Sequence, residues 1–221
     1  MDATKIQPNV AAPIVGDDGE AVVKKQQAKK KKEEIKPNDG LRKPDDAGWY
    51  VAVVRVNCEV KIAKSIQLNL NRNDIWFEYW VPKIKVVYID KRTQKRKVKD
   101  QLFLSTFIFC NVSPTQLDEI RFRSDVYKML TMPGQRSIYK VPDHEIINYR
   151  NLVENDEIPV TAAVVPLKKG KKVRIMEGKM KGLEAYVQRY TDKKAVIGNE
   201  IKYVSGATIE INREMLEIVE D

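Results

Sequence analysis

The feature that most constrains the fold is an abrupt change in character at Trp49. The first 47 residues contain few large apolar side chains and no hydrophobic period, and a run of lysines is followed there by glutamates, at Lys29–Glu34. Such a stretch cannot bury enough apolar surface to offset chain entropy. We therefore predict that residues 1–47 form a disordered charged tail, which either stays solvated or tethers a nucleic acid or protein partner. The core must be built from residues after this point.

From Trp49 to about residue 154 the chain alternates between strand-like and helix-like patterns. Apolar residues at helical spacing indicate helices, and aromatic or β-branched runs indicate strands. The predicted order is a strand at Trp49–Val56, a helix ending near Asn71, an extended segment at Ile75–Ile89, a polar hairpin tip at Lys91–Lys97, a return strand at Leu102–Val112, a helix starting at Ser113, a strand at Val126–Met132 and a helix from Pro142. The return strand is apolar on both faces, as in a central strand covered on both sides. This order predicts an α+β domain over residues 48–154.

The rest of the chain has a different pattern. Residues 155–166 contain Pro159 and Pro166, and we predict a linker there. Residues 167–221 hold short strand patterns separated by glycines and polar turns, with no long helix. Closely spaced short strands are typical of a small all-β barrel.

The composition narrows the choice of partners and compartment. The net charge is +9, which favours polyanionic partners such as nucleic acid without proving contact. Two cysteines, Cys58 and Cys110, are not spaced as a CxxC pair and indicate a reducing compartment. No stretch approaches the roughly 20 apolar residues of a membrane span. We expect a cytoplasmic protein with no membrane partner.

The sequence offers no residues for an enzyme. His144 is the single histidine, and its place after Pro142-Asp143 is typical of a solvated surface residue rather than a general base. Gly178-Lys179 lacks the Ser or Thr that a phosphate loop needs next, because Met180 stands there. We predict no catalytic residues, no cofactor and no metal.

Two stretches resemble a known family. Trp49-Tyr50, Asn57-Cys58-Glu59, Val81-Pro82-Lys83, the basic hairpin and Thr106-Phe107-Ile108-Phe109 resemble the NGN domain of NusG-type factors. The segment Lys169–Leu183, with a late Ile209-Glu210-Ile211, resembles the KOW motif and its SH3-like barrel. The resemblance covers roughly residues 49–221. It implies an NGN domain, an antiparallel sheet with helices, followed by a KOW domain at 167–221.

The resemblance also implies a function. Such factors bind the clamp helices of RNA polymerase through an apolar depression on the NGN domain and suppress pausing or premature termination. The sequence is most similar to UpxY-type paralogues that serve capsule polysaccharide operons. An alternative is a KOW-containing RNA-binding protein of the translation apparatus.

Three groups of candidate site residues follow. In the family, the positions of Phe107, Phe109 and Met129 line the polymerase-binding surface; as residues alone, they could equally be plain core. The hairpin Lys83–Lys99 has eight Lys or Arg residues against one acid, so it is either a solvated tip or a contact to phosphates of upstream DNA or nascent RNA. Its candidates are Lys91, Arg92, Lys95, Arg96 and Lys97. The KOW motif positions are Gly170, Val173, Gly178, Lys179 and Gly182, in a basic segment that would meet a protein partner or RNA.

Two departures from the family pattern stand out. Leu104-Ser105-Thr106-Phe107 occupies the place of the family's Phe-Pro-Gly-Tyr, so the aromatic residue remains and we predict that the Pro-Gly kink is lost. Ala185 stands where a glycine often precedes the valine pair of the KOW motif. Both departures indicate a divergent paralogue.

Overall fold

The computed structural model describes residues 38–167 and 170–219, so residues 1–37 of the predicted tail lie outside it. The last residues of that predicted tail are ordered. The Asn38 side chain donates to the Phe77 carbonyl at 2.9 Å and accepts from Asn71 Nδ2 at 2.8 Å. Asn38, which lies within the predicted tail 1–47, is therefore bonded to the first domain.

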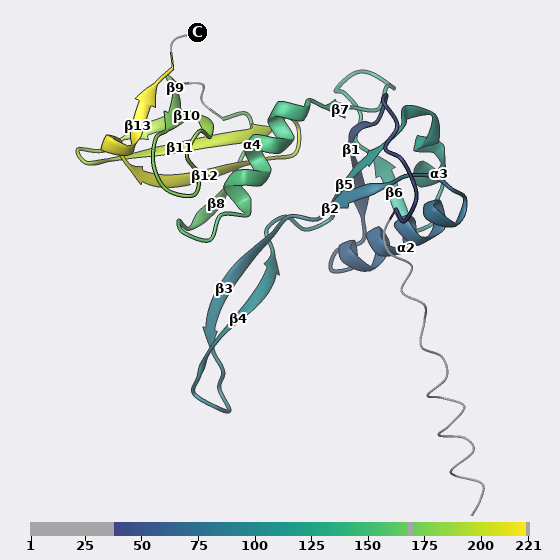
Figure 1. The fold of residues 1–221 in the computed structure, drawn as a ribbon, viewed down its shortest axis with the longest axis horizontal. Helices are drawn as coiled ribbons and strands as arrows, with labels where there is room; N and C mark the ends of the chain where they lie inside the picture. Colours follow the sequence, from purple (N-terminus) through teal and green to yellow (C-terminus); the bar gives the residue numbers. More distant parts are fainter. Residues whose placement is uncertain (1–37, 168–169, 220–221) are drawn as a thin grey trace, which may run out of the picture. The chain divides into compact units, whose positions relative to one another are not determined.

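The first sheet is antiparallel, with the strand order β2-β5-β1-β6 and with β7 also pairing to β1 (Figure 1). Its strands are β1 Gly48–Val54, β2 Glu78–Trp80, β5 Phe107–Val112, β6 Val126–Met129 and β7 Lys140–Val141. Its helices are α2 Glu59–Arg72, a 3-10 turn at Pro114–Gln116, α3 Leu117–Arg121 and α4 Asp143–Val153. The element order agrees with the sequence-based prediction, including a β5 that is central and covered on both sides.

Alternation along β1 and β5 divides the core between two faces of this sheet. On the back face, Tyr50, Ala52 and Ile108 pack with α2 and α3. On the front face, Trp49, Val51 and Phe109 pack in a second cluster that includes the buried side of α4. We use "front face" for the α4 side throughout.

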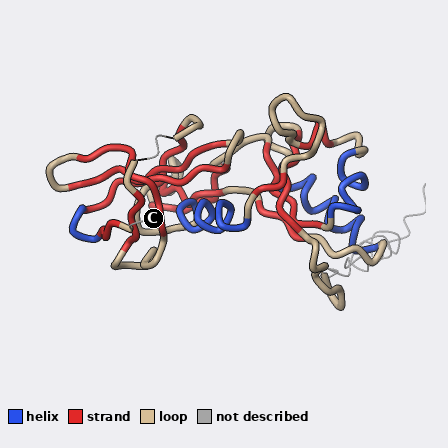
Figure 2. Tube along the Cα trace, turned by 90° about the horizontal axis from the view of Figure 1, so that it is seen from above, coloured by secondary structure: helices blue, strands red, loops and turns tan. Residues whose placement is uncertain are grey.

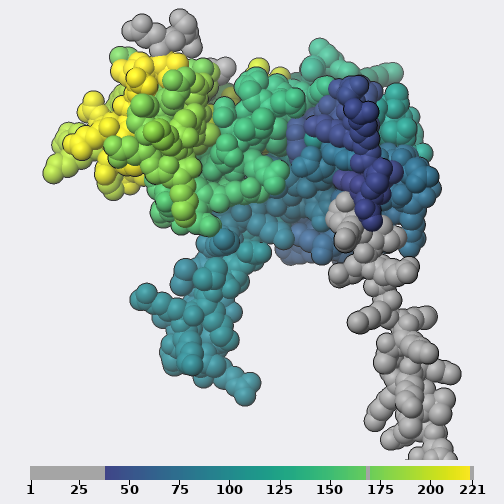
Figure 3. Space-filling model, in the orientation of Figure 1, coloured from purple at the N-terminus to yellow at the C-terminus, as the bar shows by residue number. Residues whose placement is uncertain are grey.

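A two-stranded arm leaves this sheet between β2 and β5 (Figures 1 and 3). It consists of β3 Lys83–Ile89 and β4 Arg96–Leu102, paired from Lys83↔Leu102 to Ile89↔Arg96. The predicted return strand Leu102–Val112 is wrong in part, because the strand that returns along the hairpin is β4. Residues 103–106 do not belong to a strand and connect β4 to β5. The polar side chains of β4 are explained by its exposure to solvent on both faces.

The C-terminal residues form a six-stranded antiparallel sheet with the order β13-β9-β10-β11-β12-β8. The strands are β8 Val160–Ala163, β9 Lys172–Ile175, β10 Glu184–Tyr190, β11 Lys194–Ile201, β12 Ser205–Asn212 and β13 Leu216–Ile218, with a 3-10 turn at Arg213–Met215. The predicted linker 155–166 is corrected, since it contributes β8. The predicted barrel is not confirmed, because no pairing between described strands joins β13 to β8.

Helix α4 packs mainly against β11 and β12 of the C-terminal sheet, and to a lesser extent against β1 (Figure 2). Its buried side chains Ile146, Tyr149, Leu152 and Val153 belong to one apolar cluster with residues of both sheets. The helix starts directly after Pro142, as predicted. Among the described residues, no helix is long and apolar enough to cross a membrane.

Candidate functional site

The front face of the first sheet carries a cluster of aromatic rings. Phe109 is fully buried and lies 5.1 Å, centroid to centroid, from Trp80 of β2. The Trp80 ring is in turn 6.1 Å from Tyr149 of α4 in an edge-on arrangement. Phe103 lies 6.4 Å from the same tyrosine. Tyr149 of α4 thus packs against Trp80 and Phe103, and Phe109 lies on the other contact of the Trp80 ring.

Helix α4 is fixed over these rings by polar contacts at its C-terminal end. Trp80 Nε1 donates to Glu154 Oε1 at 2.8 Å, so the buried indole finds its hydrogen-bond partner in the helix cap. Arg150 forms an ion pair with Glu154 at 3.1 Å and lies 5.8 Å from the centroid of the Trp80 ring. These groups are partly exposed, so they specify the position of α4 more than they stabilise it.

The turn between β11 and β12 contacts the other end of the front face. Tyr203, in this turn, is edge-on to Tyr139 with ring centroids 5.3 Å apart. The backbone N–H of Lys202 faces Glu145 Oε2 at 3.5 Å. Burial raises the pKa of the Tyr139 hydroxyl above its ordinary value, and the nearby Glu145 carboxylate adds to the effect. Burial also raises the pKa of Tyr149 to about 12.

The structure brings together two of the three predicted polymerase-binding residues. Phe107 and Phe109 share the front face, as their spacing predicts, but Phe109 is sealed whereas Phe107 is half-buried. Met129 is paired with Ala52 and belongs to the back-face cluster, so its predicted place beside the two phenylalanines is corrected. The polymerase-binding role of Phe107 and Phe109 stays a prediction.

The basic arm presents its predicted nucleic-acid residues to solvent. Lys91, Arg92, Lys95, Arg96 and Lys97 are all exposed. Asp90 shapes the tip, because its carboxylate accepts from the backbone N–H of Arg92 at 2.9 Å and pairs with Lys97. The hydrogen bond from Lys97 is the largest cause of a lowered pKa of Asp90. Asp90, the acid at the tip of the arm, is thus used to build the turn.

The register of the arm gives it two different faces, which the sequence reading did not separate. On one face, Tyr88 is paired with Lys97 and has Lys99 Nζ 5.4 Å from its ring centroid. On the other face, Val87 lies opposite Val98, and both side chains are more than half exposed. An exposed aromatic ring between lysines is the combination that suits stacked bases and phosphates. Strict alternation counted from the pairing Val87↔Val98 is the signal that would have revealed it.

Three of the predicted KOW motif residues, Gly178, Lys179 and Gly182, lie in the turn between β9 and β10. Gly178 and Gly182 have φ values of 77° and 87°, which favour glycine, and Gly182 N–H donates to the Ile175 carbonyl at 2.7 Å. A side chain at Gly170 would lie 2.2 Å from the Val187 carbonyl oxygen. Val173 is buried in the sheet core, and Lys179 is exposed. Lys179 also contacts the chain, because its backbone N–H donates to Glu157 Oε2 at 3.3 Å and its Nζ lies 3.8 Å from Glu157 Oε1.

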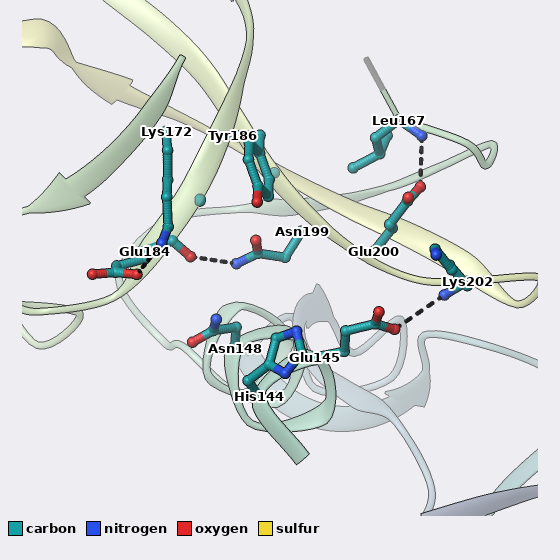
Figure 4. Close-up of a pocket in the computed structure, with 12 residues that line it drawn as sticks. His144, Glu145, Asn148, Leu167, Lys172, Glu184, Tyr186, Asn199, Glu200 and Lys202 are labelled. Atoms are coloured by element: carbon teal, nitrogen blue, oxygen red, sulfur yellow. Dashed lines mark hydrogen bonds and ion pairs between the residues drawn. The ribbon is translucent and has the colours of Figure 1, made fainter. Parts of the chain in front are cut away.

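A cavity of about 340 Å³ lies between α4 and the C-terminal sheet (Figure 4). Its floor includes the small residues Ala185 and Gly198. Several of its polar groups already have partners in the chain: Lys172 pairs with Glu184 at 2.9 Å, and the Glu200 carboxylate accepts from Leu167 N–H at 2.6 Å. His144 lines the cavity but is exposed, as predicted. Within the described residues, no group of His, Cys, Asp or Glu is arranged to hold a metal.

Solved structures of NusG and Spt5 proteins align with this chain at low similarity. Thermotoga maritima NusG, from a structure on domain interaction, has 14% identity and a TM-score of 0.42, with 79% of this chain and 98% of that chain covered. An MjSpt4:Spt5 complex, conformation A, gives 15% identity and a TM-score of 0.27, with 78% and 99% covered. TM-scores this low do not establish a shared fold. No curated protein matches significantly.

The family models give the stronger result. The model described as transcription termination factor NusG matches residues 47–150, which span the first sheet, the arm and most of α4. These are the elements that carry the aromatic front face and the basic arm. Residues 47–150, just under half of the chain, thus match the NusG family model.

Proposed function

We propose that this protein is a transcription elongation or antitermination factor that binds RNA polymerase through the front face of its NusG-family domain. The observation that carries the proposal is the family match over residues 47–150. The front face supports it, because Phe107 offers partly open apolar area beside a larger buried aromatic surface. Aromatic side chains dominate the energetics of such interfaces.

The proposed mechanism is binding alone, in the cytoplasm, with catalysis left to the polymerase. A factor that binds the elongating polymerase better than the paused polymerase shifts the population towards elongation. The arm would add contacts to upstream DNA or nascent RNA through phosphate attraction, with Tyr88 available for stacking. The C-terminal sheet, as the proposed KOW domain, would take a protein partner. The operons served would be polysaccharide loci.

Binding of polymerase to the front face requires a movement within the protein, because this face is covered in the structure. Phe109 and Trp80 lie beneath α4, and Tyr203 of the C-terminal sheet closes over Tyr139. A polymerase helix can reach the buried rings only if α4 or the β11–β12 turn moves aside. The affinity of the factor is therefore reduced by the fraction of molecules in which the face is closed.

The direct test is co-elution of the purified chain with its cognate RNA polymerase, followed by a terminator read-through assay. We expect a stable complex, and we expect Phe107→Asp to abolish it while the thermal unfolding transition is retained. The matched control is Tyr127→Asp, which places the same charge on an exposed aromatic residue of the same domain. Equal binding by the Phe107→Asp and wild-type proteins would defeat the proposed docking face. Co-sedimentation with ribosomal subunits instead of polymerase would favour a role in translation.

A further inference from the structure

The segment that joins the arm to the central strand contains a strained residue. Thr106 has a φ of +73°, in the left-handed region. A β-branched side chain is rarely found there, because its Cβ crowds the backbone, and such residues persist only when their surroundings hold them. The predicted loss of the kink is therefore corrected: the chain turns here without proline or glycine.

Two hydrogen bonds hold both backbone polar groups of Thr106. Its carbonyl accepts from Val54 N–H at 2.8 Å, which extends the pairing of β1 with β5. Its N–H donates to Glu59 Oε1 at 2.6 Å. Glu59 is 1% exposed, so this carboxylate is buried and its bond to Thr106 is shielded from water.

The position of Glu59 explains why a carboxylate is tolerated in the core. Glu59 is the first residue of α2 and the acidic residue of its first turn. The unpaired N–H groups and the dipole at a helix N-terminus favour negative charge. The helix thus stabilises the carboxylate, and the carboxylate reaches across 47 residues of sequence to the turn at Thr106.

The turn at Thr106 controls two features of the proposed interface. It is the second connection between the arm and the sheet, and the first connection is tied to it where Phe103 N–H donates to the Pro82 carbonyl at 2.9 Å. It also directly precedes Phe107. We propose that Glu59 is a positioning residue, which holds Thr106 in its left-handed conformation and so fixes the direction of the arm and the orientation of Phe107 for polymerase binding. This inference rests on the proposed function.

The test is a rescue experiment in the full-length protein. Glu59→Ala is expected to raise the unfolding equilibrium constant about tenfold or more, as for loss of a hydrogen bond to a charged group. It should also weaken polymerase binding by about tenfold, because the turn is no longer held. Thr106→Gly in the Glu59→Ala background should restore most of the binding, since glycine adopts this conformation without a holding group. Glu59→Gln keeps an acceptor oxygen and should stay within about threefold of wild type.

Ser105→Gly in the Glu59→Ala background is the matched control. It adds the same flexibility one residue earlier, at a position that does not have a positive φ. If Ser105→Gly rescues binding as well as Thr106→Gly does, or if neither rescues it, the positioning role is overturned.

A second readout separates this inference from the proposed function. Spin labels at Thr93→Cys on the arm tip and Asn73→Cys after α2, in a Cys58→Ser background, report the direction of the arm without any polymerase. Glu59→Ala should broaden the distance distribution, and Glu59→Gln should not. If the wild-type protein fails to bind polymerase while Glu59→Ala still broadens the distribution, the proposed function alone is contradicted. If the distance distribution of the Glu59→Ala variant is the same as that of wild type, the positioning role of Glu59 is contradicted.

Discussion

At the scale of single residues, Phe107 and Phe109 have different roles although they share one face of β5. Phe109 is enclosed by Trp80 and α4, whereas Phe107 is half-buried at the start of the strand. A buried aromatic residue stabilises the fold through its contacts, while a partly open one can still contact a partner.

We therefore predict that Phe109→Ala lowers the free energy of unfolding by about 3–5 kcal/mol, as large-to-small changes in a packed core do. Phe107→Ala should lower it by less, because part of its surface is already in water. Urea unfolding of the two variants measures both values. Phe122→Ala, at a residue that is 74% exposed, is the control for loss of a ring without loss of packing. Equal losses of unfolding free energy in Phe107→Ala and Phe109→Ala would contradict the different roles inferred from their burial.

Tyr149 gives a prediction at alkaline pH. Burial raises its folded-state pKa to about 12, above the value of about 10 expected in the unfolded chain. Between these values the folded protein keeps the proton that the unfolded chain has lost, so stability falls as pH rises. Unfolding free energies measured across this range should decline, and Tyr149→Phe should flatten that decline. A decline unchanged by Tyr149→Phe, with the exposed Tyr127→Phe as control, would mean that other groups cause it.

Residue spacing predicted part of this site. Two-residue spacing placed Phe107 and Phe109 on one face, because side chains alternate along any strand. It could not place Met129, because the face of β6 depends on its pairing with Ala52 and on a register shift at Val53/Val54. Thr106 was also missed, since a β-branched residue gives no signal for a positive φ.

At the scale of elements, the β3–β4 arm combines solvent exposure with a dense positive charge. Its tip residues are solvated, and Asp90 at the tip is engaged in the turn. Such a surface binds phosphates with little base specificity and with strong salt dependence.

We predict that changing Lys91, Arg92, Lys95, Arg96 and Lys97 to Gln flattens the salt dependence of DNA binding. Each lost phosphate contact should reduce the slope of log K against log salt concentration by about one. The control changes Lys61, Lys64 and Arg72, exposed basic residues on α2, and should alter the slope much less. An arm variant with an unaltered slope would show that the arm makes no phosphate contacts.

The sequence predicted the elements with strong periodicity and failed at two others. Helices α2 and α4 and strand β1 follow clear apolar patterns, so their positions were predicted closely. Strand β4 was not predicted, since only Arg96 and Lys97 fall in the predicted tip and only Leu102 in the predicted return strand, because β4 has no buried face to impose a pattern. Strand β8 was read as linker because prolines flank it, although its edge position requires pairing on one side only.

At the scale of the whole molecule, α4 and the β11–β12 turn contact the front face, so under the proposed function the C-terminal sheet would be coupled to polymerase binding. The sequence could not predict this coupling, because α4 was assigned to the first domain from its order in the chain. Its buried side chains instead serve both sheets.

Weakening this contact should increase polymerase affinity. Tyr203→Ser removes the ring that packs edge-on against Tyr139, and such aromatic pairs contribute about 0.5–1.5 kcal/mol. If the closed face competes with polymerase, affinity should rise roughly two- to tenfold. Tyr190→Ser is the matched control, because both tyrosines are 47% exposed and Tyr190 stacks on Arg213 within the C-terminal sheet. A Tyr203→Ser variant that binds no better than the control would argue against competition.

Amide hydrogen exchange of the full chain, with and without stoichiometric cognate RNA polymerase, tests the central claim most directly. Docking on the front face predicts added protection in 103–109, together with faster exchange in β11 and β12 where α4 is displaced. A stable complex in which 103–109 exchanges as in the free protein would contradict it.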